Sequence, residues 1–199
     1  MLEKYIRPSV QTRVIDHWIQ KVNWSRKVHP NVLTLLAAGA GVVCLIGLWQ
    51  GYPLVAVGFL SLSGFLDMLD GSIARYQGSM SQTGSVLDIL SDRFVEFLVL
   101  LGLLLQAPEE RAVLCFLMLG AILLCVTSFL VVGIFSENQS EKSFHYSPGL
   151  IERFEAFLFF AAMMLWPQYF QVLAMSFILL VFLTTGIRVY EFAYQKKGV

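Results

Sequence analysis

No charged side chain occurs between Val32 and Leu66. A helix needs about 20 mostly apolar residues to cross the hydrocarbon core of a bilayer, so this run is too long for a single crossing. Gly51, Tyr52 and Pro53 interrupt the run and form a turn signal. The run therefore predicts two membrane-spanning helices, roughly 32–50 and 53–75.

The rest of the chain continues this pattern. Of its 199 residues, 57% are apolar and only 14% are charged, whereas soluble domains carry about 25% charged residues. Polar breaks separate four further apolar segments, which predict helices at about 83–106, 112–136, 149–165 and 168–193. The expected fold is an all-α integral membrane protein with six transmembrane helices in one domain, residues 31–195.

The distribution of positive charge predicts an orientation for these helices. Six spans place both chain ends on one side, and every Lys and Arg except Arg111 then falls on that side or at the helix ends beside it. Because basic residues concentrate on the cytoplasmic side of membrane proteins, we expect the termini to face the cytoplasm. The expected membrane is the cell inner membrane.

The first 30 residues have a different character. Apolar residues recur every four positions from Val10 to Val22, with polar residues largely opposite. This pattern predicts an N-terminal amphipathic juxtamembrane helix. It lies either in the plane of the headgroups or against the cytoplasmic ends of the bundle.

Four aspartates stand where the second helix ends and the third begins: Asp67, Asp70, Asp88 and Asp92. Helical spacing places each pair on one helix face, and the short 76–82 link makes the two helices antiparallel neighbours. The four carboxylates are therefore expected around one cavity at the cytoplasmic boundary. Ionisable groups near the hydrocarbon region are costly and usually functional.

Four like charges in one cavity repel each other, so either some are protonated or cations neutralise them. Only Arg75 and Arg93 are expected close by, and two arginines cannot balance four aspartates. Mg²⁺ is commonly held by one or two carboxylates together with substrate phosphates, so a pyrophosphate-containing substrate fits this site. The alternative is a structural polar cluster, with Gly71, Ala74 and Gly84 serving only helix packing.

The spacing of these residues matches a family signature. The pattern D-x2-D-G-x2-A-R-x8-G-x3-D-x3-D is present without departure, and in it the chain resembles the CDP-alcohol phosphatidyltransferases. The resemblance implies an enzyme of phospholipid biosynthesis. It would move a phosphatidyl group from a CDP-linked lipid, such as CDP-diacylglycerol, to an acceptor alcohol and release CMP. It also implies a homodimer, with no nucleic-acid partner.

The resemblance further implies roles for individual residues. Asp67, Asp70 and Asp88 would coordinate two divalent cations, Mg²⁺ or Mn²⁺. Asp92 would lie at the edge of this metal cluster and act as the general base for the acceptor hydroxyl. The CDP moiety would contact a larger set of residues: Asn31, Thr34, Asp67, Asp70, Gly71, Ala74, Arg75 and Gly84.

The acceptor alcohol is less determined. Family members that use a phosphorylated acceptor resemble one another in carrying a basic residue on the fourth helix, and the run from Ser128 to Ser136 has none. We therefore expect an acceptor that is not a sugar phosphate. Arg153 is the best single candidate for binding it. Alternatively, Arg153 is a membrane anchor paired with Glu152 or Glu155.

Two other functions use the same aspartates. A divalent-cation channel or transporter would need polar residues along the whole membrane path, but Leu54–Phe59 and Phe97–Leu105 are apolar. A pseudoenzyme that serves as a membrane scaffold would be expected to carry a broken motif, and this motif is intact. Both readings are therefore less favoured than the transferase.

Overall fold

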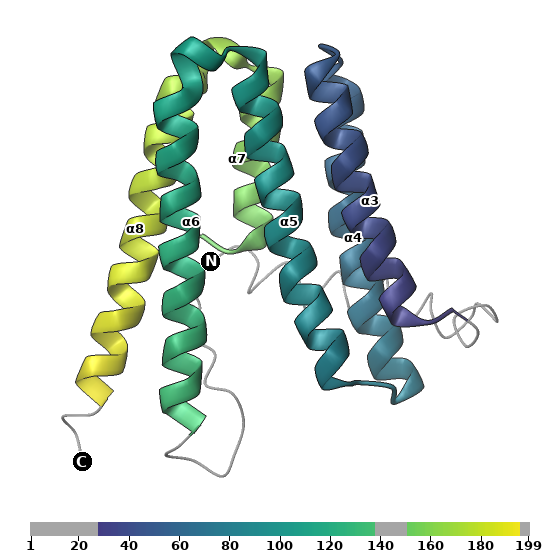
Figure 1. Cartoon of the computed structure of the whole chain (residues 1–199). Coiled ribbons are helices and arrows are strands. Elements are labelled where there is room, and N and C mark those ends of the chain that lie inside the picture. Colours follow the sequence, from purple (N-terminus) through teal and green to yellow (C-terminus); the bar gives the residue numbers. More distant parts are fainter. Residues whose placement is uncertain (1–27, 138–150, 196–199) are drawn as a thin grey trace.

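The computed structural model describes residues 28–137 and 151–195, so the predicted amphipathic segment lies almost wholly outside the described part. Every longer element in that part is a helix (Figure 1). The helices are α3 (Pro30–Trp49), α4 (Pro53–Gln77), α5 (Gln82–Gln106), α6 (Pro108–Glu137), α7 (Arg153–Leu165) and α8 (Phe170–Gln195), with a short 3-10 turn at Pro167–Tyr169. The predicted all-α membrane fold with six long helices is confirmed in the described part of the chain.

Proline and glycine set the helix boundaries. Pro30, Pro53 and Pro108 stand at the first position of their helices, where the missing N–H leaves no hydrogen bond unmade. Gly51 and Gly78 have φ values of 78° and 64°, a left-handed conformation that glycine adopts without steric strain. Turns at these two glycines reverse the chain between α3 and α4 and between α4 and α5. Helix α3 packs against both α4 and α5, whereas α4 and α5 lack the close packing expected of neighbours.

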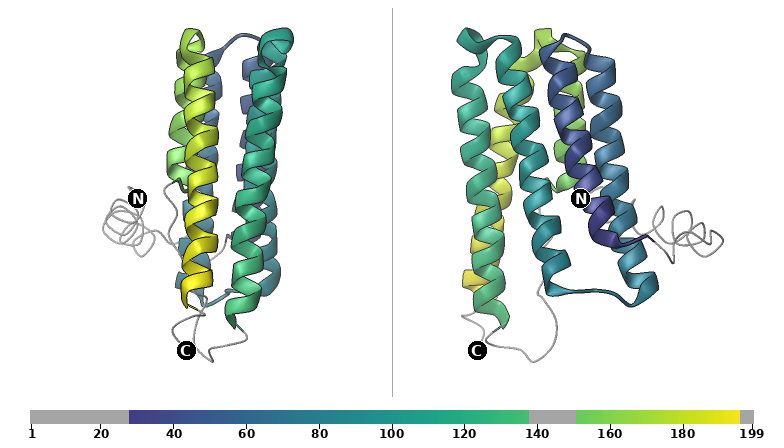
Figure 2. Two further views of the ribbon diagram at one scale, coloured as in Figure 1. Left: turned by 90° about the vertical axis from the view of Figure 1, so that its left-hand side faces the viewer. Right: turned by 45° about the vertical axis from the view of Figure 1, so that its right-hand side comes forward.

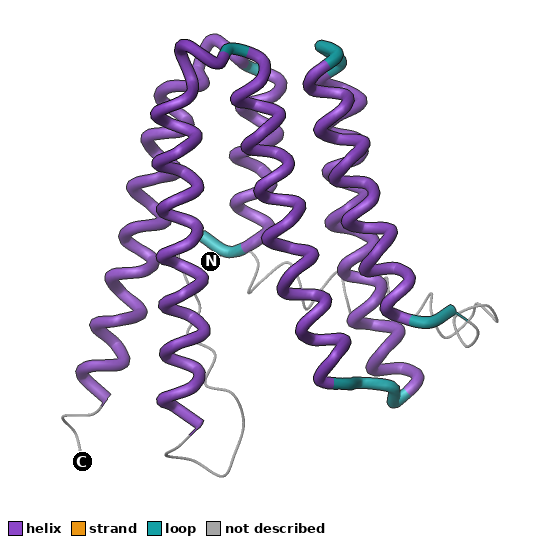
Figure 3. Tube along the Cα trace, in the orientation of Figure 1, coloured by secondary structure: helices purple, strands orange, loops and turns teal. Residues whose placement is uncertain are grey.

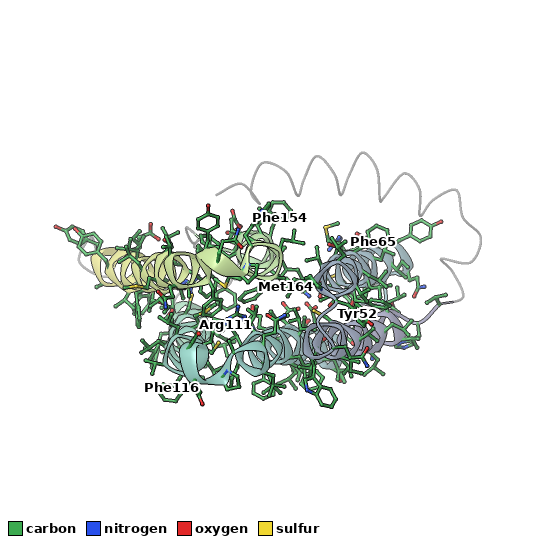
Figure 4. All side chains as sticks on the ribbon, turned by 90° about the horizontal axis from the view of Figure 1, so that it is seen from above. Tyr52, Phe65, Arg111, Phe116, Phe154 and Met164 are labelled. Atoms are coloured by element: carbon green, nitrogen blue, oxygen red, sulfur yellow. The ribbon has the colours of Figure 1, made fainter. Side chains whose placement is uncertain are left out.

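The six helices form two layers of three. Viewed from above, α3, α5 and α6 make one layer, and α4, α7 and α8 make the other (Figure 4). The edge-on view separates the two layers at the α6 and α8 end (Figure 2). Contacts cross between the layers from α3 to α4, from α5 to α7 and from α6 to α8. Segments distant in sequence are thereby brought to one interior.

The outer surface is apolar. Phe65, Phe116 and Phe154 point outward in Figure 4, while Met164 lies toward the interior and is 2% exposed. Four segments are long and apolar enough to cross a membrane: Pro30–Trp49, Pro53–Gln77, Pro108–Phe135 and Pro167–Tyr194. The other two long helices differ from these four segments. Helix α5 carries four charged residues, Asp88, Asp92, Arg93 and Glu96, and α7 has only 13 residues. The chain is a multi-pass integral membrane protein.

Helix α7 begins later than predicted. Ile151 and Glu152 are not helical, and the first helical residue is Arg153. The side chains of Glu152 and Glu155 form a reciprocal capping box that fixes this start. Figure 3 shows α7 beginning partway along the bundle, and not at the end where α3 and α5 begin. Arg153 therefore enters the bundle interior.

Candidate active site

Three of the four predicted aspartates converge. Asp67 and Asp70 from α4 and Asp88 from α5 each offer a carboxylate oxygen, and these oxygens all lie within 4.8 Å of one another. Asp67 and Asp70 are buried, and Asp88 is half-buried. Hard divalent cations prefer such clustered oxygen ligands. The three residues together could hold a divalent metal ion.

Asp92 is not one of these three clustered aspartates but lies beside Asp67, and it contacts two arginines. One of its carboxylate oxygens lies 2.5 Å from Nη1 of Arg153, and the other lies 3.8 Å from Nη2 of Arg93. The same Nη1 of Arg153 also pairs with Asp67. A single guanidinium from α7 thus bridges Asp67 of the metal-type cluster and Asp92 on α5.

This bridge corrects two sequence-based expectations. The expectation that only Arg75 and Arg93 lie close enough to neutralise the aspartates is wrong, because Arg153 pairs with two of them. Arg75 instead donates a hydrogen bond to Ser72 over 3.1 Å. The expected pairing of Arg153 with Glu152 or Glu155 is also not found among the described residues, where its ion-pair partners are the two aspartates.

The first turns of α3 lie against the acidic cluster. The hydroxyl of Thr34 donates a 2.5 Å hydrogen bond to Asp70, and Ser91 donates to the backbone carbonyl of Thr34 over 3.3 Å. Such a bond orients a carboxylate that is to serve as a ligand. A Cβ atom at Gly84 would lie 3.5 Å from the side-chain oxygen of Asn31. Asn31, Thr34 and Gly84 therefore gather beside the aspartates, as predicted for one binding site.

The surroundings of Gly71 differ from those of a packing glycine. A Cβ added at Gly71 would meet only Nη1 of Arg75, at 3.5 Å, among the described atoms. By contrast, a Cβ at Gly102 would come within 2.6 Å of Leu48, where α5 packs on α3. Ala74 is half-buried, one turn further along α4. The space beside Gly71 favours a role in admitting a ligand.

A larger side chain at Gly71 tests this interpretation. We expect Gly71→Leu to insert and fold normally but to lose binding of a CDP-linked lipid, because the new side chain fills the space beside Asp70. Binding is measured with a radiolabelled CDP-lipid on purified protein, and folding by thermal denaturation. The matched control is Gly102→Leu, which should destabilise the fold by overpacking. A misfolded Gly71→Leu variant would support the packing alternative.

A cavity of about 280 Å³ adjoins the aspartates on the side of α6 and α8. Its charged lining comprises five carboxylates and three guanidinium groups: Asp67, Asp88, Asp92, Glu96, Glu152, Arg93, Arg153 and Arg188. Apolar residues such as Ile122, Phe129 and Phe177 complete the wall. Carboxyl groups outnumber guanidinium groups in this lining, and this suits a bound cation.

Two charged cavity residues carry no sequence-based prediction. Glu96, one turn beyond Asp92, is 5% exposed and pairs with Arg93 at 2.7 Å. Arg188 on α8 is 8% exposed, and its Nη1 donates to the carbonyl of Cys125 over 2.9 Å and to Ser128 over 3.1 Å. Arg188 is the only charged residue between Glu155 and Glu191. That isolation was an available signal, since a lone charge in an apolar helix is usually functional.

Comparison with known proteins places the chain in a family. The sequence profile of the CDP-alcohol phosphatidyltransferase family matches residues 27–187. The inner membrane protein YnjF of Escherichia coli is 32% identical, covering 96% of this chain and 95% of that protein. The phosphatidylinositol phosphate synthase of Corynebacterium glutamicum is 30% identical, covering 71% of this chain and 64% of that protein.

Solved structures share the fold. The phosphatidylinositol phosphate synthase of Mycobacterium tuberculosis, in complex with manganese and citrate, superposes with a TM-score of 0.68 at 20% identity and covers 83% of each chain. The same enzyme with CDP-DAG bound gives 0.66 at 22% identity, covering 90% of this chain and 94% of that one. With the family profile spanning most of its length, the chain belongs to the CDP-alcohol phosphatidyltransferases and is an enzyme of that family.

Proposed function

We propose that this enzyme transfers a phosphatidyl group from CDP-diacylglycerol to an acceptor alcohol that carries an anionic group. The observation that carries the proposal is the cavity in which Asp92 faces Arg153, with Arg188 in the same lining. The carboxylate suits removal of a proton from a hydroxyl, and the arginines suit recognition of an anion. The bound CDP-DAG of the Mycobacterium tuberculosis enzyme supports the choice of lipid donor.

The proposed reaction is a single displacement at phosphorus. The acceptor hydroxyl gives its proton to Asp92, and its oxygen forms a bond to the lipid-linked phosphorus. The bond between that phosphorus and the oxygen of the CMP phosphate breaks, and CMP leaves with the electron pair. Attack of this kind needs the reacting atoms held close together. Asp92 is anchored for this by Arg153 on one side and Arg93 on the other.

Asp67, Asp70 and Asp88 would hold Mg²⁺ or Mn²⁺, and their mutual distances of 4.8 Å or less fit such a group. A divalent cation held there would neutralise the negative charge of the pyrophosphate. It would also stabilise the charge that develops at the phosphoryl group under attack. Thr34 would orient Asp70 through its hydroxyl. The manganese bound by the Mycobacterium tuberculosis enzyme supports this choice of metal.

The anionic acceptor is inferred from unpaired guanidinium nitrogens. Within the described residues, Nε and Nη2 of Arg153 and Nε of Arg188 are buried and have no hydrogen-bond partner. Buried donors are rarely left unpaired, so a phosphate or carboxylate of the acceptor is a suitable partner. The expectation of an unphosphorylated acceptor rested on the lack of a basic residue on α6. Arg188 removes that argument, because it reaches α6 from α8 and bonds to Ser128.

The proposal is tested by following CMP release from CDP-diacylglycerol with purified enzyme and a panel of acceptors. The panel pairs neutral alcohols, such as glycerol and inositol, with their phosphates, and adds serine as a carboxylate-bearing alcohol. We expect CMP release to depend on an anionic member of the panel. Equal rates with neutral alcohols would contradict the anionic acceptor while leaving the transfer reaction intact.

Arg153→Ala and Arg188→Ala should each raise the KM for the acceptor by roughly tenfold or more, since each removes charge-assisted hydrogen bonds. The KM for CDP-diacylglycerol should stay close to the native value. Arg188→Lys should recover only part of the loss, because an ammonium group cannot form a planar, two-pronged contact. Arg75→Ala, whose side chain does not line this cavity, is the control for the acceptor KM. An unchanged acceptor KM in both variants would return these arginines to a structural role.

The predicted cytoplasmic orientation stays a proposal supported by the charge distribution. We expect a membrane-impermeant maleimide to reach Gln50→Cys, but not Ser79→Cys, from outside intact cells. Gln50 and Ser79 are exposed and lie at opposite ends of the bundle. The reverse labelling pattern would overturn the orientation. The homodimer stays a prediction.

A further inference from the structure

Asp67 belongs to two groups at once. One of its carboxylate oxygens lies within 4.8 Å of a carboxylate oxygen of Asp70 and of Asp88. Its Oδ2 also pairs with Arg153. The Arg153 side chain is only 17% exposed, so little solvent screens the charge that it brings to the cluster. Any cation held by the three aspartates must therefore share Asp67 with a guanidinium.

From this shared carboxylate we infer that Arg153 couples the metal site to the acceptor site. In the metal-free protein the guanidinium pairs with both Asp67 and Asp92 and offsets one of their two negative charges. Metal held at Asp67, Asp70 and Asp88 competes for Asp67 and turns the guanidinium towards Asp92 and the cavity. An acceptor anion bound by Arg153 likewise weakens the ion pair between Arg153 and Asp67, which leaves the Asp67 carboxylate available to the metal. The two ligands therefore bind with positive coupling.

The sign of the effect follows from charge. Arg153 and a divalent cation repel each other at a separation of a few ångströms, and such repulsion is strong where water is largely excluded. Arg153 also has an opposite effect on metal affinity. Its contact with Asp67 holds that carboxylate in place, and an oriented ligand binds metal more tightly. We take repulsion to dominate, since Thr34 and helix α4 already restrict the neighbouring carboxylates.

The inference rests on the proposed function and is tested by Mn²⁺ binding, measured from the electron paramagnetic resonance signal of free Mn²⁺ without substrate. Arg153→Gln should bind Mn²⁺ roughly tenfold more tightly than native enzyme or more, whereas Arg153→Lys should stay near the native affinity. Arg111→Gln removes one positive charge near the start of α6, away from the aspartates, and as the control it should stay near the native Mn²⁺ affinity. Weaker or unchanged binding in Arg153→Gln would overturn the inference.

A second measurement gives its main result on the native enzyme. Sulfate, as a dianion that imitates the acceptor's anionic group, should tighten Mn²⁺ binding to the native enzyme and have no effect on Arg153→Gln. If sulfate leaves the native affinity unchanged, the coupling is wrong even if the variant fails to fold. Failure of the native enzyme to bind Mn²⁺ at all would remove the metal role in the proposed function and, with it, this inference.

Discussion

Asp92→Asn should lower kcat by about 10²–10⁴-fold, the range usually lost when a general base is removed. The amide keeps the size of the carboxylate but cannot accept the proton of the acceptor hydroxyl. Asp92 lies outside the group formed by Asp67, Asp70 and Asp88, so binding of CDP-diacylglycerol should stay close to native. Single-turnover measurement of CMP formation, with a separate binding assay, separates the two effects.

Asp88→Asn is the matched control for Asp92→Asn, because it lies one turn earlier on α5 and belongs to the three-aspartate group. This variant should lose Mn²⁺ binding and nucleotide binding as well as turnover. Near-native turnover in Asp92→Asn would mean that another group takes the proton. Glu96, buried one turn further along α5, would then be the next candidate.

Removal of divalent metal should abolish CMP release. The aspartates of the cavity lining, when ionised, would repel the pyrophosphate of a CDP-linked lipid unless cations intervene. Treatment with EDTA, followed by dialysis, should bring activity to background. Addition of Mn²⁺ or Mg²⁺ should restore it, whereas Ca²⁺, which takes more ligands at longer distances, should restore it poorly. Full activity after chelation would exclude the metal-assisted reaction.

The helices could be predicted from the sequence because each boundary has a local cause. Pro53 and Gly78 mark the ends of α4 by chain geometry alone, and apolar runs mark the membrane-spanning helices. The start of α7 was missed, because its capping box of Glu152 and Glu155 resembles an ordinary polar loop. Propensity and hydropathy do not separate a helix from the two residues before it.

The four aspartates could be predicted as a group because they lie on two consecutive helices with a short link. The bridge from Arg153 could not, since it depends on where α7 packs against α4 and α5. Arg188 was missed for the same reason. Its partners Cys125 and Ser128 come from α6, about 60 residues earlier, and a sequence gives no register between such distant helices.

The short α7 has a consequence for enzyme kinetics. Its 13 residues rise only about 20 Å, at about 1.5 Å per residue, while the hydrocarbon core is about 30 Å thick. Arg153 and the aspartates that it bridges are therefore recessed from the end of the bundle where α3 and α5 begin (Figure 3). A CDP-linked lipid bound there would keep its tails in the bilayer, and the proposed acceptor alcohol would enter from the water. The rate should follow the mole fraction of CDP-lipid within the membrane or micelle, and diluting that lipid with inert detergent should slow the enzyme at constant bulk concentration.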